Sequence, residues 1–168
     1  MELKIQKIYE TFYKNNPVLD VGVGFGKNLN MLLSRFKWSD VVGVDPNFET
    51  LSSVLSLARD WRVHLIVAVA EALPFRESVF ALVSSWATMH HITHKYNAII
   101  DMRRVLSNEG IIVIADWNEG GRHFTPHSGE ELRTSMRETI KNVENILSII
   151  NESVDEKYFI IVAKKSAN

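Results

Sequence analysis

The chain has no cysteine among its 168 residues. This absence excludes disulfide bonds, a cysteine nucleophile and a thiolate metal site, and it favours an intracellular protein. Basic residues are not in excess either, with 19 Lys and Arg against 20 Asp and Glu, so no overall positive field indicates a nucleic-acid partner. No apolar run approaches the roughly 18 residues of a membrane helix, and no signal-peptide segment opens the chain. We therefore expect a single cytoplasmic domain over residues 1–168 that does not contact a membrane.

Apolar runs typical of strands alternate with segments of helical spacing along most of the chain. The expected strands are residues 17–22, 40–45, 63–69, 79–85 and 111–115, and the expected helices are 2–14 (within an N-terminal helical segment 1–16), 29–36, 48–58 and 94–107. Such alternation predicts an α/β fold with a doubly wound parallel sheet and right-handed crossovers. Its ligand is expected at the carboxyl ends of the strands.

The last third of the chain has a different pattern. Ser128-Gly129-Glu130-Glu131 has the spacing of a capping box, which predicts that another helix begins there. Two apolar runs follow, at 146–150 and 158–163, and they are separated by polar residues. These runs predict a hairpin, although the first run also fits an extension of the helix.

Residues 20–26, Asp-Val-Gly-Val-Gly-Phe-Gly, lie between the first expected strand and the next helix. A loop of this kind can press its backbone against a nucleoside-containing ligand, and a turn that binds nothing is the plain alternative. The dinucleotide motif needs glycine at position 27, which is Lys27, and a phosphate-binding loop needs glycine at 21 and a hydroxyl at 28, where Val21 and Asn28 stand. A carboxylate at Asp20 would repel phosphate and favour a cationic ligand.

Five segments, in their order and spacing, resemble the motifs of class I (Rossmann-like) S-adenosylmethionine (SAM) methyltransferases of the generic small-molecule branch. They are residues 18–26, 42–45, 70–75, 83–92 and 104–111. The resemblance covers roughly Val18 to Trp117. It implies a three-layer α/β/α fold whose seven-stranded, mostly parallel sheet has an antiparallel C-terminal strand beside the fifth strand. It also implies SAM as the cofactor and methyl transfer as the reaction.

The resemblance assigns a cofactor site residue by residue. Gly22 and Gly24 would let the backbone pass beside the methionine part of SAM, with Asp20 ahead of them. Asp45 would accept hydrogen bonds from both ribose hydroxyls, a role for which a carboxylate has the lone pairs. The remaining implied contacts are Pro46, Leu73 and the backbone N–H of Ala70 at the adenine, Ser85 and Trp86 at the methionine end, and Tyr9 or Tyr13 at the SAM carboxylate.

The sequence departs from the family pattern at two places. Many relatives have Gly-Asp where this chain has Ala68-Val69, and that Asp holds the adenine amino group. One adenine hydrogen bond, worth roughly 0.5–1.5 kcal/mol, is therefore missing unless Glu71 substitutes for it. Many relatives also open the fourth strand with Phe-Asp, whereas this chain has Phe80-Ala81.

Methyl transfer from SAM is an in-line displacement on an activated carbon, so the protein supplies mainly orientation, desolvation and sometimes a base. The catalytic candidates are His90, as a base near neutral pH, and Asp116, as a group that binds an acceptor amine. The plain alternatives are that His90 is solvated with His91 packed under the loop, and that Asp116 caps a loop. Trp86, Trp117 and Phe124 are candidates for an aromatic wall around the acceptor, although Trp86 also fits a core position.

No metal site is expected, because His123, His127 and Asp116 fall around a loop without an ordered helix. The absence of Asn/Asp-Pro-Pro-Tyr after the fourth strand argues against amino-group methylation of adenine or glutamine. Only the first 16 residues and the 117–127 loop are placed to cover a small acceptor. The acceptor is thus left open as a small molecule, a protein or RNA, and a homodimer or a partner subunit is a candidate for completing the pocket.

We expect a SAM-dependent methyltransferase. The first alternative is a non-catalytic SAM- or nucleoside-binding partner subunit, which the missing adenine Asp motivates. The second is an NAD-dependent oxidoreductase, which Lys27 disfavours because it replaces the last glycine of the dinucleotide motif.

Overall fold

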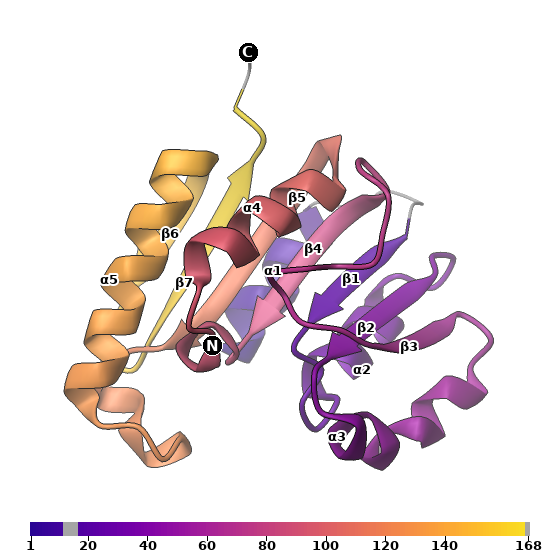
Figure 1. The fold of residues 1–168 in the computed structure, drawn as a ribbon, viewed down its shortest axis with the longest axis horizontal. Coiled ribbons are helices and arrows are strands. Elements are labelled where there is room, and N and C mark those ends of the chain that lie inside the picture. The colour runs from indigo at the N-terminus through magenta and orange to yellow at the C-terminus, as the bar shows by residue number, and fades with distance from the viewer. Residues whose placement is uncertain (12–16, 167–168) are drawn as a thin grey trace.

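The computed structural model describes residues 1–11 and 17–166, and it shows one sheet between two layers of helices (Figure 1). The sheet has seven strands in the order β3-β2-β1-β4-β5-β7-β6. The first five strands in the chain are parallel, and β7 runs antiparallel to both of its neighbours. The strands are β1 Val18–Val21, β2 Val41–Asp45, β3 Val63–Val67, β4 Phe80–Trp86, β5 Leu106–Trp117, β6 Ser148–Val154 and β7 Tyr158–Lys164.

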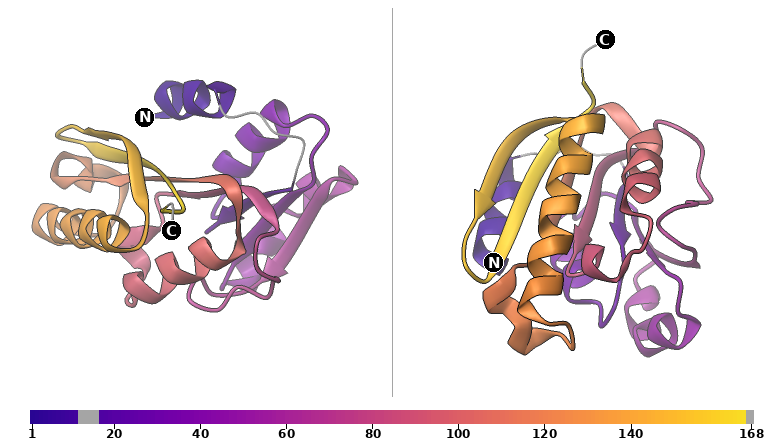
Figure 2. Two further views of the ribbon diagram at one scale, coloured as in Figure 1. Left: turned by 90° about the horizontal axis from the view of Figure 1, so that it is seen from above. Right: turned by 60° about the vertical axis from the view of Figure 1, so that its left-hand side comes forward.

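The helices divide between the two faces of the sheet, as the view from above shows (Figure 2). Leucine and isoleucine side chains of α1 and α2 pack with one set of strand residues, and those of α4 and α5 pack with the alternate set. A sheet covered on both faces needs continuously apolar strands, and β1 is buried along its whole length. The helices are α1 Glu2–Thr11, α2 Lys27–Arg35, α3 Phe48–Ser53, α4 Lys95–Val105 and α5 Gly129–Ile146, with short 3-10 turns η1 Leu55–Arg59, η2 Met89–His91 and η3 Glu119–Phe124.

The order of the strands reverses direction at β1. This strand pairs with β2 on one side and with β4 on the other, so that Asp20 lies opposite Gly43 and Ser84. Because all three strands are parallel, their carboxyl ends meet at one edge of the sheet. The gap between the chains that leave β1 and β4 at this edge is the switch point where doubly wound folds bind ligands.

The predicted architecture is confirmed, including the antiparallel strand beside β5. The capping box is also confirmed, because Ser128 Oγ accepts from the Glu131 N–H and Glu131 Oε2 accepts from the Ser128 N–H. The hairpin is confirmed as well. The 146–150 run divides between two elements, because α5 ends at Ile146 and β6 begins at Ser148.

Two predicted boundaries are wrong. The expected helix 48–58 breaks at Val54, where α3 gives way to the tighter turn η1. The expected helix 94–107 ends earlier, at Val105, because β5 already begins at Leu106 and pairs there with Phe80 through a register shift. Gly110 serves close packing and not a turn, since a Cβ at this position would lie 2.7 Å from the Leu106 side chain.

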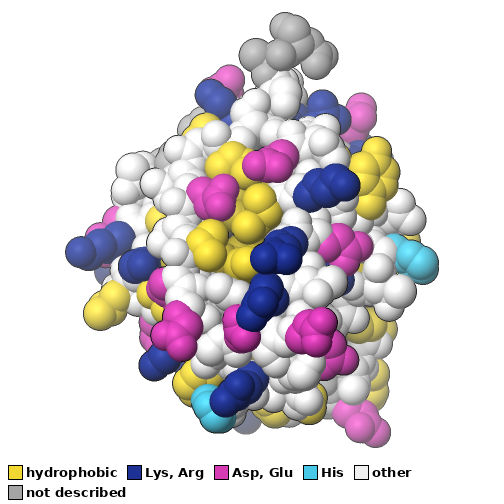
Figure 3. Space-filling model, turned by 90° about the vertical axis from the view of Figure 1, so that its left-hand side faces the viewer, with side chains coloured by type: hydrophobic (Ala, Val, Ile, Leu, Met, Phe, Trp, Pro, Cys, Tyr) yellow, Lys and Arg dark blue, Asp and Glu magenta, His cyan; other side chains and the backbone are white. Residues whose placement is uncertain are grey.

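Charged side chains of both signs surround an apolar patch on the side of the molecule formed by α5 and β6 (Figure 3). No single sign dominates this face, in line with the balanced composition. None of the helices in the described residues is both long enough and apolar enough to span a membrane.

Candidate cofactor and acceptor site

A cavity of about 860 Å³ opens at the carboxyl ends of β1, β2 and β4. This volume lies within the range of small-molecule sites, roughly 300–1,000 Å³. On one side the lining comes from the glycine loop, the end of β2 and residues 68–71. On the other side it comes from the turn after β4 and from the loop that contains Trp117 and Phe124. The cavity therefore spans the switch point of the sheet.

The glycine loop adopts backbone conformations that favour glycine. Gly22 and Gly24 have φ angles of +83° and +51°. A Cβ at Gly22 would lie 2.2 Å from Thr88 Oγ1, so this glycine lets the turn after β4 approach the loop. A Cβ at Gly24 would meet no described atom within 4 Å, so the loop borders open space there. The two glycines thus serve different purposes, one in packing and one toward the cavity.

Asp45 presents its carboxylate to the cavity while both of its oxygens are already held. Oδ2 accepts the Gly24 N–H at 3.1 Å, and Oδ1 accepts the Asn47 N–H at 2.9 Å. The residue is 9% exposed and lines the cavity. Each carboxylate oxygen has a further lone pair. The side chain is therefore fixed in place and can accept two more hydrogen bonds from a pair of hydroxyls.

Asp20 lies behind the loop and does not line the cavity. Its Oδ1 accepts from Asn28 Nδ2 at 2.6 Å, and its buried Oδ2 has no hydrogen-bond partner among the described residues. Burial raises the pKa of Asp20 to about 7, against the lowering effect of the Asn28 hydrogen bond. The expected negative charge beside the ligand is therefore only partly present at neutral pH.

Tyr9 belongs to the same buried network. Its hydroxyl contacts Asn28 Oδ1 at 2.9 Å and Ser84 Oγ, and burial raises the pKa of Tyr9 well above its usual range. The side chain is fully enclosed and is not part of the cavity lining, so the predicted contact of Tyr9 with a SAM carboxylate has no support here. Tyr13, the other candidate for that contact, lies outside the described residues.

Some of the other predicted cofactor residues line the cavity, and the rest are buried behind the residues that line it. Ser85 and Leu73 are buried off the lining, and the Leu73 N–H donates to Asp101 Oδ2. Sequence reasoning missed Lys27 and Thr88, which line the cavity, with Lys27 Nζ 5.1 Å from the centre of the Trp86 ring. The lining includes the predicted residues Gly22, Gly24, Asp45, Pro46, Ala70, Glu71 and Trp86.

His90 and Asp116, the two catalytic candidates, form a hydrogen-bonded pair beside the cavity. His90 Nδ1 lies 2.7 Å from Asp116 Oδ1, and the His90 backbone N–H donates to Asp116 Oδ2 at 2.8 Å. The pair meets because β4 and β5 are parallel neighbours, with Trp86 opposite Ala115. The two side chains are 3% and 1% exposed. The interpretation of a solvated His90 above a packed His91 is therefore wrong, since the two histidines have the opposite burial.

Asp116 also caps the chain, as the plain alternative predicted, because its Oδ1 accepts the Trp117 N–H at 2.7 Å. Beyond it, the Trp117 and Phe124 rings stack with their centres 4.8 Å apart. Both rings and Trp86 line the cavity, so the three candidates for an aromatic wall come together.

The histidines considered for a metal are arranged differently from the expected trio. His127 contacts His91, with His127 Nε2 3.3 Å from His91 Nδ1, whereas His123 is exposed and outside this group. The pKa of His91 is lowered by partial burial and by the neighbouring rings of His90 and His127. Asp116, the third residue of the expected trio, is instead hydrogen-bonded to His90.

The glycine loop after β1 and the acid at the end of β2 are joined by the Gly24–Asp45 hydrogen bond at the border of the cavity, which is the arrangement in which Rossmann-type folds bind nucleosides. Comparisons with known proteins give the family. Residues 19–114 match the family model described as "Methyltransferase domain". The chain belongs to this methyltransferase domain family.

Relatives of known or assigned activity are similar over part of their length. Malonyl-[acyl-carrier protein] O-methyltransferase of Geobacter sulfurreducens is 31% identical over 127 residues, which cover 75% of this chain and 45% of that protein. Ubiquinone/menaquinone biosynthesis C-methyltransferase of Neisseria meningitidis is 31% identical over 115 residues, 63% of this chain and 44% of that protein. The chain thus spans less than half the length of these curated relatives.

The fold is shared with a SAM-dependent methyltransferase from Aquifex aeolicus. The two structures superpose with a TM-score of 0.81 at 19% identity, and the match covers 96% of this chain and 87% of the other. At this identity the likeness supports the fold alone.

Proposed function

We propose that this chain binds SAM in the cavity at the switch point and transfers its methyl group to an acceptor. The observation that carries the proposal is a coincidence of two independent findings. The segments that match the methyltransferase family lie within residues 19–114, and most of the cavity lining comes from the same residues. The family relationship and the geometry thus indicate the same site.

The residues present fit the cofactor. The space beside Gly24 is open, and the neighbouring Asp45 carboxylate, which the Gly24 and Asn47 N–H groups hold in place, has unused lone pairs. Trp86 Nε1 is a buried donor without a hydrogen-bond partner in the described part of the chain, although its ring lines the cavity. A ligand with vicinal hydroxyls and an acceptor group would satisfy both. Glu71 lines the cavity next to Ala68 and Val69, where it is placed to replace the missing adenine Asp.

When bound, SAM supplies an activated methyl group, and the protein supplies position and a proton acceptor. Asp45 holds the ribose, and the Trp117–Phe124 stack presents an apolar wall to a small acceptor. Asp116 fixes the proton of His90 on Nδ1, which leaves Nε2 as a base, 3.4 Å from Thr125 Oγ1. We propose that His90 Nε2 takes the proton that an acceptor hydroxyl or amine loses.

Titration calorimetry with SAM and with its demethylated product tests the proposal. We expect one binding site per chain. Asp45→Ala should cost about 1.5–3 kcal/mol of binding, a roughly 10- to 150-fold weaker Kd, because two ribose hydroxyls lose their charged acceptor. Asp40→Ala is the matched control, since it removes an equal charge from an exposed site that pairs with His64. Binding of NADH without binding of SAM would overturn the proposal.

His90→Ala separates catalysis from cofactor binding in the same experiment. On the acceptor side, the loss of this residue should lower the turnover of labelled methyl groups and leave the SAM Kd nearly unchanged. Loss of SAM binding would place His90 in the cofactor site. SAM binding without any turnover on cell extracts by the unaltered chain would favour the non-catalytic partner subunit, which the Ala68-Val69 departure suggests.

A further inference from the structure

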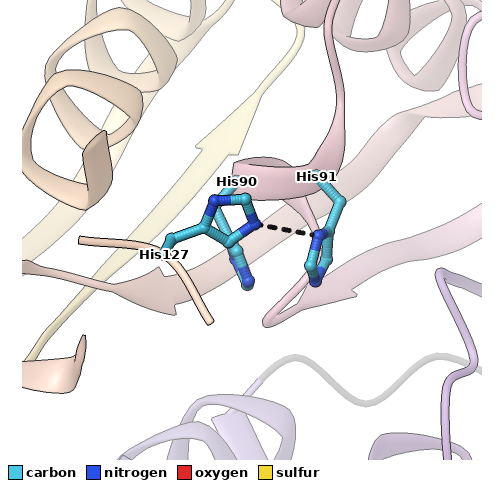
Figure 4. Close-up of side chains that lie close together, drawn as sticks. All are labelled: His90, His91 and His127. Atoms are coloured by element: carbon cyan, nitrogen blue, oxygen red, sulfur yellow. Dashed lines mark hydrogen bonds between the residues drawn. The ribbon is translucent and has the colours of Figure 1, made fainter. Parts of the chain in front are cut away.

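Three histidines from two distant segments meet at the edge of the acceptor side. His90 and His91 end the turn η2 after β4, and His127 lies two residues before Gly129, where α5 begins (Figure 4). One ligating nitrogen from each lies within 4.8 Å of the others. The ring centres are 4.0 Å, 5.1 Å and 5.3 Å apart, so each ring contacts the other two. Among the described residues, this is the group with three such ligands in reach of one ion.

We infer that His90, His91 and His127 form a binding site for a divalent transition metal of the zinc type. Nitrogens bound at about 2.0–2.1 Å to a tetrahedral ion lie roughly 3.3–3.4 Å from each other. His127 Nε2 and His91 Nδ1 are already 3.3 Å apart. Imidazole ligands suit zinc, copper or nickel, whereas magnesium and calcium take oxygen ligands. The site departs from our sequence-based expectation of no metal.

Asp116 holds His90, the third ligand, in the form that can bind a metal. His90 Nδ1 is held by Asp116 Oδ1, so the proton stays on Nδ1 and Nε2 keeps its lone pair. Histidine ligands in metal sites commonly donate their other N–H to a carboxylate, which fixes the ring and makes it a stronger ligand. The other contact of Nε2 is Thr125 Oγ1 at 3.4 Å, a weak bond that a metal would replace. The rings of His91 and His127, which are more accessible, can turn to close the remaining distance.

Three protein ligands leave at least one coordination position open. His90 and His91 line the cavity, and His127 lines the adjoining hollow with Glu130 and Glu131. The metal would thus sit where the acceptor enters, and its open position would take an oxygen atom of the acceptor. This last step rests on the proposed function. In a metal-loaded protein the lone pair of His90 Nε2 would be used by the metal, which would lower the pKa of the bound acceptor hydroxyl, and the proton of that hydroxyl would pass to water in the adjoining hollow.

The test uses the full chain, stripped of metal with a chelator and titrated with Zn²⁺ against a chromogenic indicator. We expect one zinc per chain and, with Co²⁺, the visible absorption of a tetrahedral site. His127→Ala and His91→Ala should each weaken zinc binding roughly 10- to 100-fold or more. The matched control is His123→Ala, which removes an exposed histidine of the same loop and should bind zinc like the unaltered chain. Mg²⁺ should not compete.

Zinc binding that is absent, or that His127→Ala leaves unchanged while circular dichroism shows a native fold, overturns the inference. If His91→Ala fails to fold, the Co²⁺ spectrum of the unaltered chain still decides, because a spectrum that stays that of the hydrated ion excludes the site. SAM calorimetry on the same metal-free and zinc-loaded samples separates the two proposals. SAM binding without zinc binding overturns the metal site and leaves the proposed function intact. Zinc binding without SAM binding overturns the proposed function and leaves the metal site intact.

Discussion

At the scale of single residues, Asp20 is the most unusual group in the molecule. It is a carboxyl with no exposed surface, with one oxygen held by Asn28 and the other without a partner in the described chain. Removal from water disfavours its charged form, and nearby Asp45 adds to the effect. The folded protein therefore keeps a proton on Asp20 well above the pH at which the unfolded chain releases it.

This difference predicts a pH-dependent stability for the ligand-free protein. The pKa is about 7 when folded and 3.8 in the reference state, so the contribution of Asp20 is full below pH 4 and is lost as the pH rises to 7. Asp20→Asn should remove this decline and stabilise the protein at pH 7.5 by on the order of 3 kcal/mol. Urea unfolding between pH 4 and 7.5 measures it, with Asp60→Asn as the control, because the pKa of Asp60 is lowered by Arg62. An equal decline in Asp20→Asn and the unaltered chain would contradict the prediction.

Ala87 is a second residue whose environment in the fold costs free energy, in this case through its backbone conformation. Its φ is +54°, a conformation that strains any residue with a Cβ, and its N–H is tied to Ala115 O at 2.8 Å. The kink directs the chain after β4 into the turn that carries Thr88 and His90. Such strain is often found where a structure positions functional groups.

At the scale of elements, the glycine loop joins the two halves of the site. Gly22→Ala should destabilise the fold by about 2–4 kcal/mol, because a Cβ at φ +83° would collide with the Thr88 side chain. Gly24→Ala should cost only about 1–2 kcal/mol of stability but should lose most SAM binding, since its methyl group would enter the cavity. Urea unfolding and calorimetry on both variants measure the contrast. A Gly24→Ala protein that folds and keeps its SAM affinity would mean that the ligand lies elsewhere.

The elements themselves were largely predictable, and the reasons are local. The expected strand 111–115 is continuously apolar, and Ser128 with Glu131 marks a helix start by its own chemistry. The break at Val54 and the early start of β5 at Leu106 were not predictable, because a packed turn and a register shift decide them.

For the site, the positions set by the glycine loop and the strand ends were predicted best. Gly22, Gly24 and Asp45 line the cavity where the loop and strand pattern puts them. The pairing of His90 with Asp116 and the meeting of His127 with His91 depend on contacts between residues 26 and 36 positions apart, and spacing along the chain contains no signal for them.

At the scale of the whole molecule, the cavity lies between two sets of elements that contact mainly through β1 and β4. A ligand that fills it should stabilise the entire chain. SAM at one hundred times its Kd should raise the free energy of unfolding by about 2.7 kcal/mol. Hydrogen exchange should slow both at residues 44–50 and at 86–93, which border the cavity on opposite sides. Protection confined to one side, or equal stabilisation of Asp45→Ala, would contradict a ligand that spans the switch point.

The position of β7 has a consequence for how the protein is made. This strand follows β6 in the chain but lies between β5 and β6, and it pairs with both. During synthesis, the edge of β5 therefore remains without its neighbour until residue 164 has left the ribosome. An unpaired strand edge invites association with other chains, and pairings between distant segments form slowly. The nascent protein should thus depend on chaperones in the interval between the completion of β5 and the arrival of β7.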